Sequence, residues 1–281
     1  MTVLRFLIET LTTFLRQGCP SLAAALAFFS LLSLFPLVFL LLYGISFLVS
    51  QNIIGEQFIL SFLKGFLPSL GERLAEELHR ISVLEGVRWL VLLSFFWFGG
   101  LVFYELDYAL NVVFESTQKR HPLISTAISI ALLGSTGLLL FLSYVATQTI
   151  AFLTAYAPKL WGLDLVALAA HDFNLTYTLP FSQAFLTVSL LYLLVPRRRP
   201  QWSHAMAGAL TFGLLWVSAK LLFVNYSDYA TVYARLYGSL LEVVLLLLWV
   251  YYSAGLLLFG GIIARKLQQL AYSSQVPADS G

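Results

Sequence analysis

Six apolar stretches, separated by short polar segments, dominate the pattern of this chain. The hydrocarbon core of a membrane is about 30 Å thick, and a helix needs about 20 apolar residues to cross it. Most stretches reach that length, and the fourth, which is shorter, is expected to begin earlier, near Phe173. The stretches are Leu22 to Val49, Trp89 to Phe114, Leu123 to Ile150, Pro180 to Val195, Trp202 to Val224 and Leu240 to Ile263.

These stretches favour helices over the strands of a membrane barrel. Barrel strands alternate apolar and polar residues, whereas a run such as Val243 to Trp249 is apolar at every position. We therefore predict an all-α polytopic membrane protein with six transmembrane helices, which occupy residues 20–266.

The segments outside these helices have their own patterns. In residues 1–19, apolar side chains recur at helical spacing and predict an amphipathic helix on the inner membrane surface or against the protein's own inner loops. Residues 50–88 predict one or two amphipathic helices on the outer side, broken near Pro68 and Gly71. Residues 157–178 and 225–237 are expected to be outer loops. Residues 267–281 should form a cytoplasmic tail, disordered from Ser273 onward.

Composition supports a membrane protein and argues against a nucleic-acid partner. The 281 residues are 59% hydrophobic and 11% charged, with a mean hydropathy of +0.85 and a formal net charge of +2. Soluble domains carry about 25% charged residues. The charge is too small to indicate nucleic-acid binding. Cys19 is the single cysteine, so an intrachain disulfide is impossible, and we expect it to serve as a small packing residue.

The basic residues predict the orientation. Short cytoplasmic loops are enriched in lysine and arginine, and placing both termini in the cytoplasm puts most of the 16 basic residues there. The inner set is Arg5, Arg16, Lys119, Arg120, Arg197, Arg198, Arg199, Arg265 and Lys266. We therefore expect a multi-pass membrane protein with both ends in the cytoplasm.

Four charged residues fall inside the predicted spans, where each costs about 2.5–3.5 kcal/mol on insertion scales. The depth of each along its helix predicts two separate groups. Lys220 and Glu242 should form a pair near the outer face, with Arg235 and Asp228 close by. Glu105 belongs to a second group, near the inner face.

Asp107 and Asn111 complete the inner group and are four residues apart, so they share one helical face. Their expected cationic partners are Lys119, Arg120 and the basic loop Arg197, Arg198 and Arg199. Two interpretations stay open for both groups. They are ion pairs that hold helices in register, or they line a polar path for a substrate or proton.

Pro36 and several pairs of small residues predict local helix geometry. Pro36 lies inside the first span and should kink it, with the hydroxyl of Ser30 or Ser33 available to the backbone carbonyl that the proline leaves free. Small residues predict close helix contacts. They are Ala23/Ala27, Gly99/Gly100, Ala205/Ala209, Gly208/Gly213 and Gly255/Gly260/Gly261.

No pattern of catalytic residues is visible. His79, His121, His171 and His204 are scattered over both sides of the membrane and lack metal-ligand spacing, so no metal or cofactor is predicted. A phosphate-binding glycine loop and a nucleophile elbow are also missing from the sequence. We therefore predict that the protein is not an enzyme.

Four blocks of sequence together resemble the YihY/virulence factor BrkB family of bacterial inner-membrane proteins. They begin with residues 23–36 (AAALAFFSLLSLFP) and Ala109-Leu110-Asn111, continue with residues 191–199 (LYLLVPRRR), Trp202 and residues 208–210 (GAL), and end with residues 237–240 (YGSL), 248–251 (LWVY) and Gly260-Gly261. The resemblance covers residues 20–265 and implies six helices with both ends in the cytoplasm.

The resemblance also implies a loose link to virulence and envelope integrity, suspected movement of lipid or other hydrophobic material, and a ribonuclease label. We reject the label because the inner segments offer only Glu9, Glu115 and Asp279 as acids for a metal. Where the family often has Gly-Ala-Glu at the end of the last span, this chain has Gly260-Gly261-Ile262. A mechanism that requires that acid would need Glu242 or another carboxylate here.

Two functional hypotheses follow. The first is a transporter or flippase for a lipid or amphipathic envelope component, with membrane lipids as its surroundings. It predicts a cavity lined by Glu105, Asp107, Asn111 or Lys220. The second is a non-transporting scaffold or envelope-integrity protein, which predicts a closed, fully packed bundle. The sequence indicates no oligomeric state.

Overall fold

The computed structural model describes residues 3–50, 85–116, 179–237 and 240–275, separate helical positions between 124 and 149, and two short strands. Only the backbone is described for both strands and for residues 3–4, 41–50, 85–88, 91, 179–180, 223–237, 240, 242 and 273–275. The chain divides into two compact units. Unit 1 contains Met1–Ala25 and Glu105–Gly281, and unit 2 contains Leu26–Tyr104. Of the predicted outer segment 50–88, residues 51–84 lie outside the described residues, as do Lys119 and Arg120.

The predicted amphipathic N-terminal helix is present as α1 (Val3–Arg16) and is followed directly by α2 (Cys19–Ser50). Gly18 separates the two helices with a φ of +68°, a left-handed conformation that glycine adopts without steric cost. Pro20 occupies the first turn of α2. Backbone N–H groups in the first turn have no partner within the helix, so a proline there removes no helical hydrogen bond. The break between the two helices, at residues 17 and 18, lies just before the boundary predicted at residue 19.

Pro36 lies within α2, which remains helical on both sides of it. Of the two serines predicted to serve the carbonyl left free by Pro36, Ser33 does not do so, and the role of Ser30 remains a prediction. The Ser33 hydroxyl donates instead to the carbonyl of Ser30, at 2.9 Å. That carbonyl lies three residues before Ser33, within easy reach of its short side chain.

The remaining long helices are α5 (Glu85–Val113), α8 (Leu179–Leu194), α9 (Trp202–Tyr237) and α10 (Leu240–Gln275). Every described position between 124 and 149 is also helical. Three helices in the described part of the chain are long and apolar enough to cross a membrane, namely Cys19–Leu40, Trp202–Leu222 and Val243–Tyr272. They match the first, fifth and sixth predicted spans. Phe181–Leu194 is a shorter apolar helix, and the count of six remains a prediction.

Three sequence-based expectations need correction. Residues 225–237 are not a loop, because α9 continues through Tyr237, and residues 273–275 belong to α10. The chain is also not purely helical. Strands β1 (Lys159–Leu160) and β2 (Leu163–Asp164) pair antiparallel inside the predicted outer loop, with Lys159 opposite Asp164. Such a short hairpin leaves the architecture predominantly helical.

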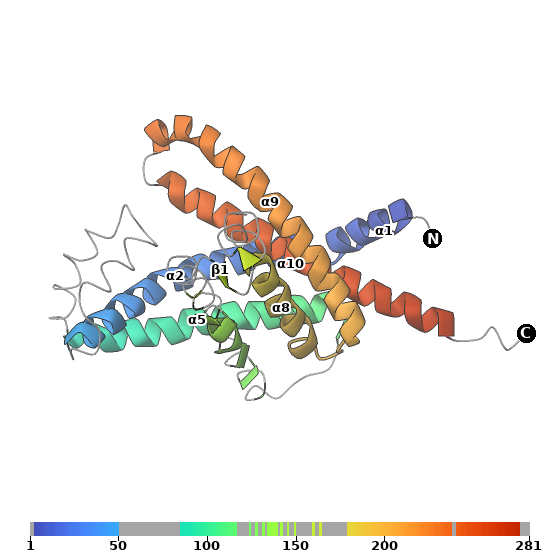
Figure 1. Cartoon of the computed structure of the whole chain (residues 1–281), viewed down its shortest axis with the longest axis horizontal. Coiled ribbons are helices and arrows are strands. Elements are labelled where there is room, and N and C mark those ends of the chain that lie inside the picture. Colours follow the sequence, from blue (N-terminus) through green and yellow to red (C-terminus); the bar gives the residue numbers. More distant parts are fainter. Residues whose placement is uncertain are drawn as a thin grey trace, which may run out of the picture. The chain divides into compact units, whose positions relative to one another are not determined.

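Within unit 1, α9 packs along α10, α8 packs against α9, and α1 contacts α10 (Figure 1). The closest approach joins Gly208 of α9 to Gly260 of α10. A Cβ placed on Gly208 would lie 2.5 Å from the carbonyl oxygen of Gly260. Ala205 and Ala209 flank this point and are fully buried. The predicted close contact at these small residues is therefore confirmed.

The other predicted small-residue contacts have mixed outcomes. Ala23 and Ala27 are buried. A Cβ on Gly213 would meet the ring of Phe181 at 2.7 Å, and one on Gly255 would approach only the ring of Phe14, at 3.9 Å. A Cβ on Gly99 or Gly100 would meet no described atom within 4 Å, so the close contact predicted there remains a prediction.

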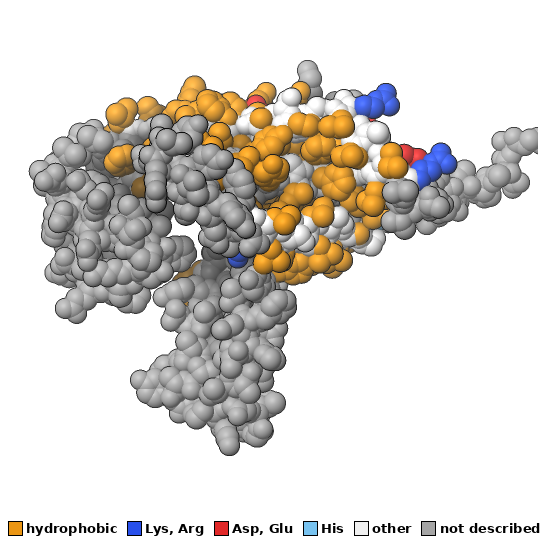
Figure 2. Space-filling view, turned by 90° about the horizontal axis from the view of Figure 1, so that it is seen from above, with side chains coloured by type: hydrophobic (Ala, Val, Ile, Leu, Met, Phe, Trp, Pro, Cys, Tyr) orange, Lys and Arg blue, Asp and Glu red, His pale blue; other side chains and the backbone are white. Residues whose placement is uncertain are grey.

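Large apolar side chains cover much of the described surface, as the orange areas of Figure 2 show. Examples are Trp202 and Leu222 on α9 and Val244 on α10, all of them exposed. In water such a surface would drive aggregation, whereas hydrocarbon solvates it without penalty. The exposed faces of these helices are therefore suited to contact lipid.

Candidate functional site at the end of α5

The carboxyl end of α5 is tied to the α8–α9 connection by an ion pair. The Arg197 guanidinium donates to Oδ2 of Asp107 at 2.9 Å, and the two side chains are 23% and 18% exposed. Arg197 follows Pro196, and α8 ends at Leu194, because proline cannot continue a helix. The predicted partnership between Asp107 and the basic loop is therefore confirmed for Arg197.

Asn111 forms a second link to the same arginine. Its side-chain Oδ1 accepts a hydrogen bond from the backbone N–H of Arg197 at 3.0 Å. Its Nδ2 donates to the backbone carbonyl of Asp107 at 2.6 Å, which fixes the orientation of the amide. Asn111 is buried, so these two bonds satisfy polar atoms that would otherwise be costly to remove from water.

Arg265 of α10 caps the same end of α5. It is 8% exposed, and its guanidinium donates to the backbone carbonyl of Val113 at 2.6 Å and pairs with Oε1 of Glu115 at 2.8 Å. The last carbonyls of a helix lack intrahelical partners and carry partial negative charge, which a buried cation stabilises. The sequence predicted only that Arg265 lies on the cytoplasmic side, and its role in capping α5 was not predicted.

The backbone after α5 folds into a Schellman motif. Ser116 N–H bonds the carbonyl of Asn111 at 2.9 Å, and Glu115 N–H bonds that of Val112 at 3.1 Å. The motif needs a left-handed residue, normally glycine, yet Glu115 occupies that position with a φ of 50°. A left-handed non-glycine residue costs about 1–2 kcal/mol. The side chain of Glu115 offsets this by its pair with Arg265 and by accepting a hydrogen bond from Gln17 at 3.3 Å.

A tightly packed core lies beside these polar contacts. The Tyr192 hydroxyl donates to the carbonyl of Leu257 on α10, and its ring lies 6.0 Å from that of Phe114. Gly260 and Gly261 leave room for these side chains, since a Cβ on Gly260 would lie 2.7 Å from the Tyr192 hydroxyl. Ile262, where the family often has an acid, is fully buried in this apolar core.

The other predicted site residues are not brought into this cluster. Glu105 is partly buried and forms no ion pair or hydrogen bond with any described residue. Arg198 and Arg199 are exposed, and neither contacts Asp107. Lys220 is partly exposed on α9. The side chain of Glu242 lies outside the described residues, so the predicted outer pair remains a prediction.

One pocket in the described part of unit 1 has a volume of about 170 Å³ and lies next to the cap of α5. None of the residues predicted to line a substrate cavity contributes to it. Its lining residues are Phe114, Arg198, Arg265, Gln268, Gln269 and Tyr272. Among the described side chains, no cluster of histidine, cysteine or acids could hold a metal ion. Cys19 is fully buried, as expected for a packing residue.

The described helices are long and apolar, expose apolar faces, and are joined by polar contacts at the end of α5. These features define a helical membrane protein. The chain belongs to the family described as virulence factor BrkB, whose model matches residues 10–280. The resemblance noted in the sequence is thereby confirmed.

Several curated relatives carry the name UPF0761 membrane protein. One from Idiomarina loihiensis is 27% identical over 214 residues, which cover 76% of this chain and 72% of the relative. One from Aliivibrio fischeri is 27% identical over 246 residues, which cover 87% of this chain and 77% of the relative. One from Rhodospirillum rubrum is 27% identical over 265 residues, covering 93% of this chain and 58% of that protein. No solved structure matches the chain.

Proposed function

We propose that this protein moves a lipid or another amphipathic envelope component across the bacterial inner membrane, and that the Asp107–Arg197 pair closes the inner end of its path. The 2.9 Å contact between these partly buried side chains carries the proposal. Ionised groups at membrane depth are expensive and by default mark a pathway for a substrate or ion. A pair that joins a helix to a connecting loop can open when the loop moves.

Glu105 supplies the second part of the argument. It precedes Asp107 by two residues on α5, so the two side chains point to different faces of the helix. Glu105 has no polar partner among the described residues and is only partly buried. A carboxylate in that position is available to a cation, a proton or a polar headgroup while Asp107 is held by Arg197.

The experiment is transport of headgroup-labelled lipid in proteoliposomes, with a membrane-impermeant quencher reporting the fraction moved. Wild-type protein should exceed empty vesicles for at least one headgroup class. Asp107→Asn should change the rate, because it weakens the closing pair without changing side-chain volume. Arg199→Gln is the matched control, since Arg199 is exposed and lies in the same loop. Rates equal to those of empty vesicles for all headgroups, with and without a proton gradient, would remove the proposal.

A second candidate function is a scaffold that binds envelope partners without transport. The backbone contact between Gly208 and Gly260 favours it, because helices packed this closely leave no path between α9 and α10 at that level. The scaffold predicts correctly folded protein that gives no transport in the same assay. It also predicts that Asp107→Asn alters stability alone.

A further inference from the structure

We propose that the pocket beside the α5 cap binds the anionic phosphate of an amphiphile, with Arg198 and Arg265 as its charged ligands. Both arginines line the pocket, together with Gln268, Gln269 and Tyr272. All of these groups can donate hydrogen bonds, and phosphate oxygens only accept them at neutral pH. The binding does not require transport and would also serve a scaffold.

The charge at the pocket is unbalanced. Glu115 pairs with Arg265 but does not line the pocket, and no described residue forms an ion pair or hydrogen bond with the Arg198 side chain. The two arginines are also near enough to repel each other. An anion between them would relieve that repulsion, and arginine recognises phosphate through its planar fork of donors.

Arg265 provides a second, independent indication of a ligand. Its side chain is 8% exposed, and its Nε is buried without a hydrogen-bond partner in the structure. A buried guanidinium with an unmade hydrogen bond is unfavourable, and such groups call for an explanation such as a missing ion or water. The pocket volume of about 170 Å³ is far above the roughly 10–15 Å³ that one water needs.

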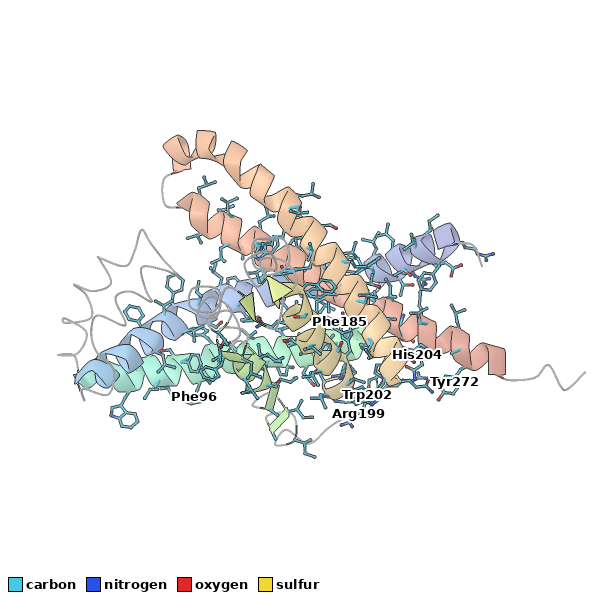
Figure 3. The ribbon with its side chains drawn as sticks, viewed as in Figure 1. Phe96, Phe185, Arg199, Trp202, His204 and Tyr272 are labelled. Carbon is cyan, nitrogen blue, oxygen red and sulfur yellow. The ribbon has the colours of Figure 1, made fainter. Side chains whose placement is uncertain are left out.

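The position of the pocket favours a lipid headgroup over a peptide. Arg265 and Lys266 are the first charged residues of α10 after Glu242, and at a rise of 1.5 Å per residue Tyr272 lies about 10 Å beyond Arg265. Headgroups occupy this layer of a bilayer. Figure 3 shows Tyr272 and Arg199 at the same end of unit 1, and exposed Trp202, an interfacial residue type, is labelled there too.

The test measures binding of a fluorescent short-chain phosphatidic acid to the full-length protein in neutral detergent. Diacylglycerol with the same chains is the phosphate-free comparison. Arg198→Gln should weaken phosphatidic acid binding by about tenfold, the effect of losing one charge-assisted hydrogen bond. Tyr272→Phe should weaken it by about threefold. No described residue forms a hydrogen bond or ion pair with the Arg198 side chain, and Tyr272 is exposed, so we expect both variants to remain folded.

Arg199→Gln is the matched control, because it removes the same charge one residue away and outside the pocket. It should bind phosphatidic acid as wild type does, and no variant should alter diacylglycerol binding. Excess inorganic phosphate distinguishes the sources. Displacement of the probe identifies free phosphate as sufficient, and resistance identifies the lipid headgroup. The inference would be overturned if Arg198→Gln and Arg199→Gln lost the same affinity for phosphatidic acid, or if neither lost any. It would also be overturned if only a peptide carboxylate displaced the probe.

Discussion

The ion pair between Asp107 and Arg197 gives the most quantitative prediction. At 2.9 Å and an effective dielectric constant of about 20, the attraction alone is roughly 6 kcal/mol, and desolvation of both ions offsets most of it. Exposed pairs contribute about 0.2–1 kcal/mol, whereas breaking a fully buried pair costs about 3–5 kcal/mol. With side chains 18% and 23% exposed, we expect a coupling free energy of about 2 kcal/mol.

A double-mutant cycle measures this coupling. Wild type, Asp107→Asn, Arg197→Gln and the double variant are unfolded by heat in neutral detergent, with tryptophan fluorescence as the readout. The double variant should be more stable than the sum of the single losses predicts, by about 2 kcal/mol or on the order of 5 °C. Asp107→Asn combined with Arg199→Gln is the control cycle and should be additive. Additivity within about 0.5 kcal/mol for the Asp107 and Arg197 cycle would refute the reasoning.

Three further predictions concern packing and capping, and all are measured by the same thermal unfolding. Gly208→Ala should cost about 1–3 kcal/mol because its Cβ would press on the backbone of Gly260, whereas Gly99→Ala, which meets no described atom, should be neutral or stabilising. Equal effects would contradict the close contact. Arg265→Gln should cost about 1–3 kcal/mol, since the carbonyl of Val113 loses its charged donor, whereas Glu115 is 51% exposed and stays hydrated. Glu115→Gly should change the free energy of unfolding by less than about 1 kcal/mol. Glycine relieves the strain of the left-handed backbone, and this gain offsets the loss of the ion pair with Arg265. A loss of stability as large as that of Arg265→Gln would refute this prediction.

The sequence predicted those features that depend on local spacing. Length and hydropathy located α2, α9 and α10, and the four-residue spacing of Asp107 and Asn111 placed both on one face. Depth along the helices then indicated that this face lies level with the basic loop. The contact with Arg197 follows from this combination.

The cap formed by Arg265 could not be predicted in the same way. Arg265 and Val113 are 152 residues apart, and no local pattern relates them. Glu115 is also a poor signal for a left-handed helix end, where glycine is the usual marker. The only available signal was that both ends were predicted at the same membrane face.

The length of α9 was underestimated because hydropathy and helicity were treated as one property. Residues 225–237 contain asparagine, serine, aspartate and tyrosines, which lower the hydropathy and suggested a loop. The segment from 214 to 237 contains neither proline nor glycine, however, so nothing in it stops a helix. That observation would have predicted the continuation to Tyr237.

We propose that the end of α5, the Arg197 loop and the anion pocket lie at the cytoplasmic face. Labelling of an Arg199→Cys variant with a membrane-impermeant maleimide tests this directly. Arg199 is exposed, and Cys19, the single native cysteine, is fully buried, so background labelling should be low. We predict labelling in inside-out vesicles and none in intact spheroplasts. Labelling in intact spheroplasts would contradict the orientation and with it the proposed inner closure.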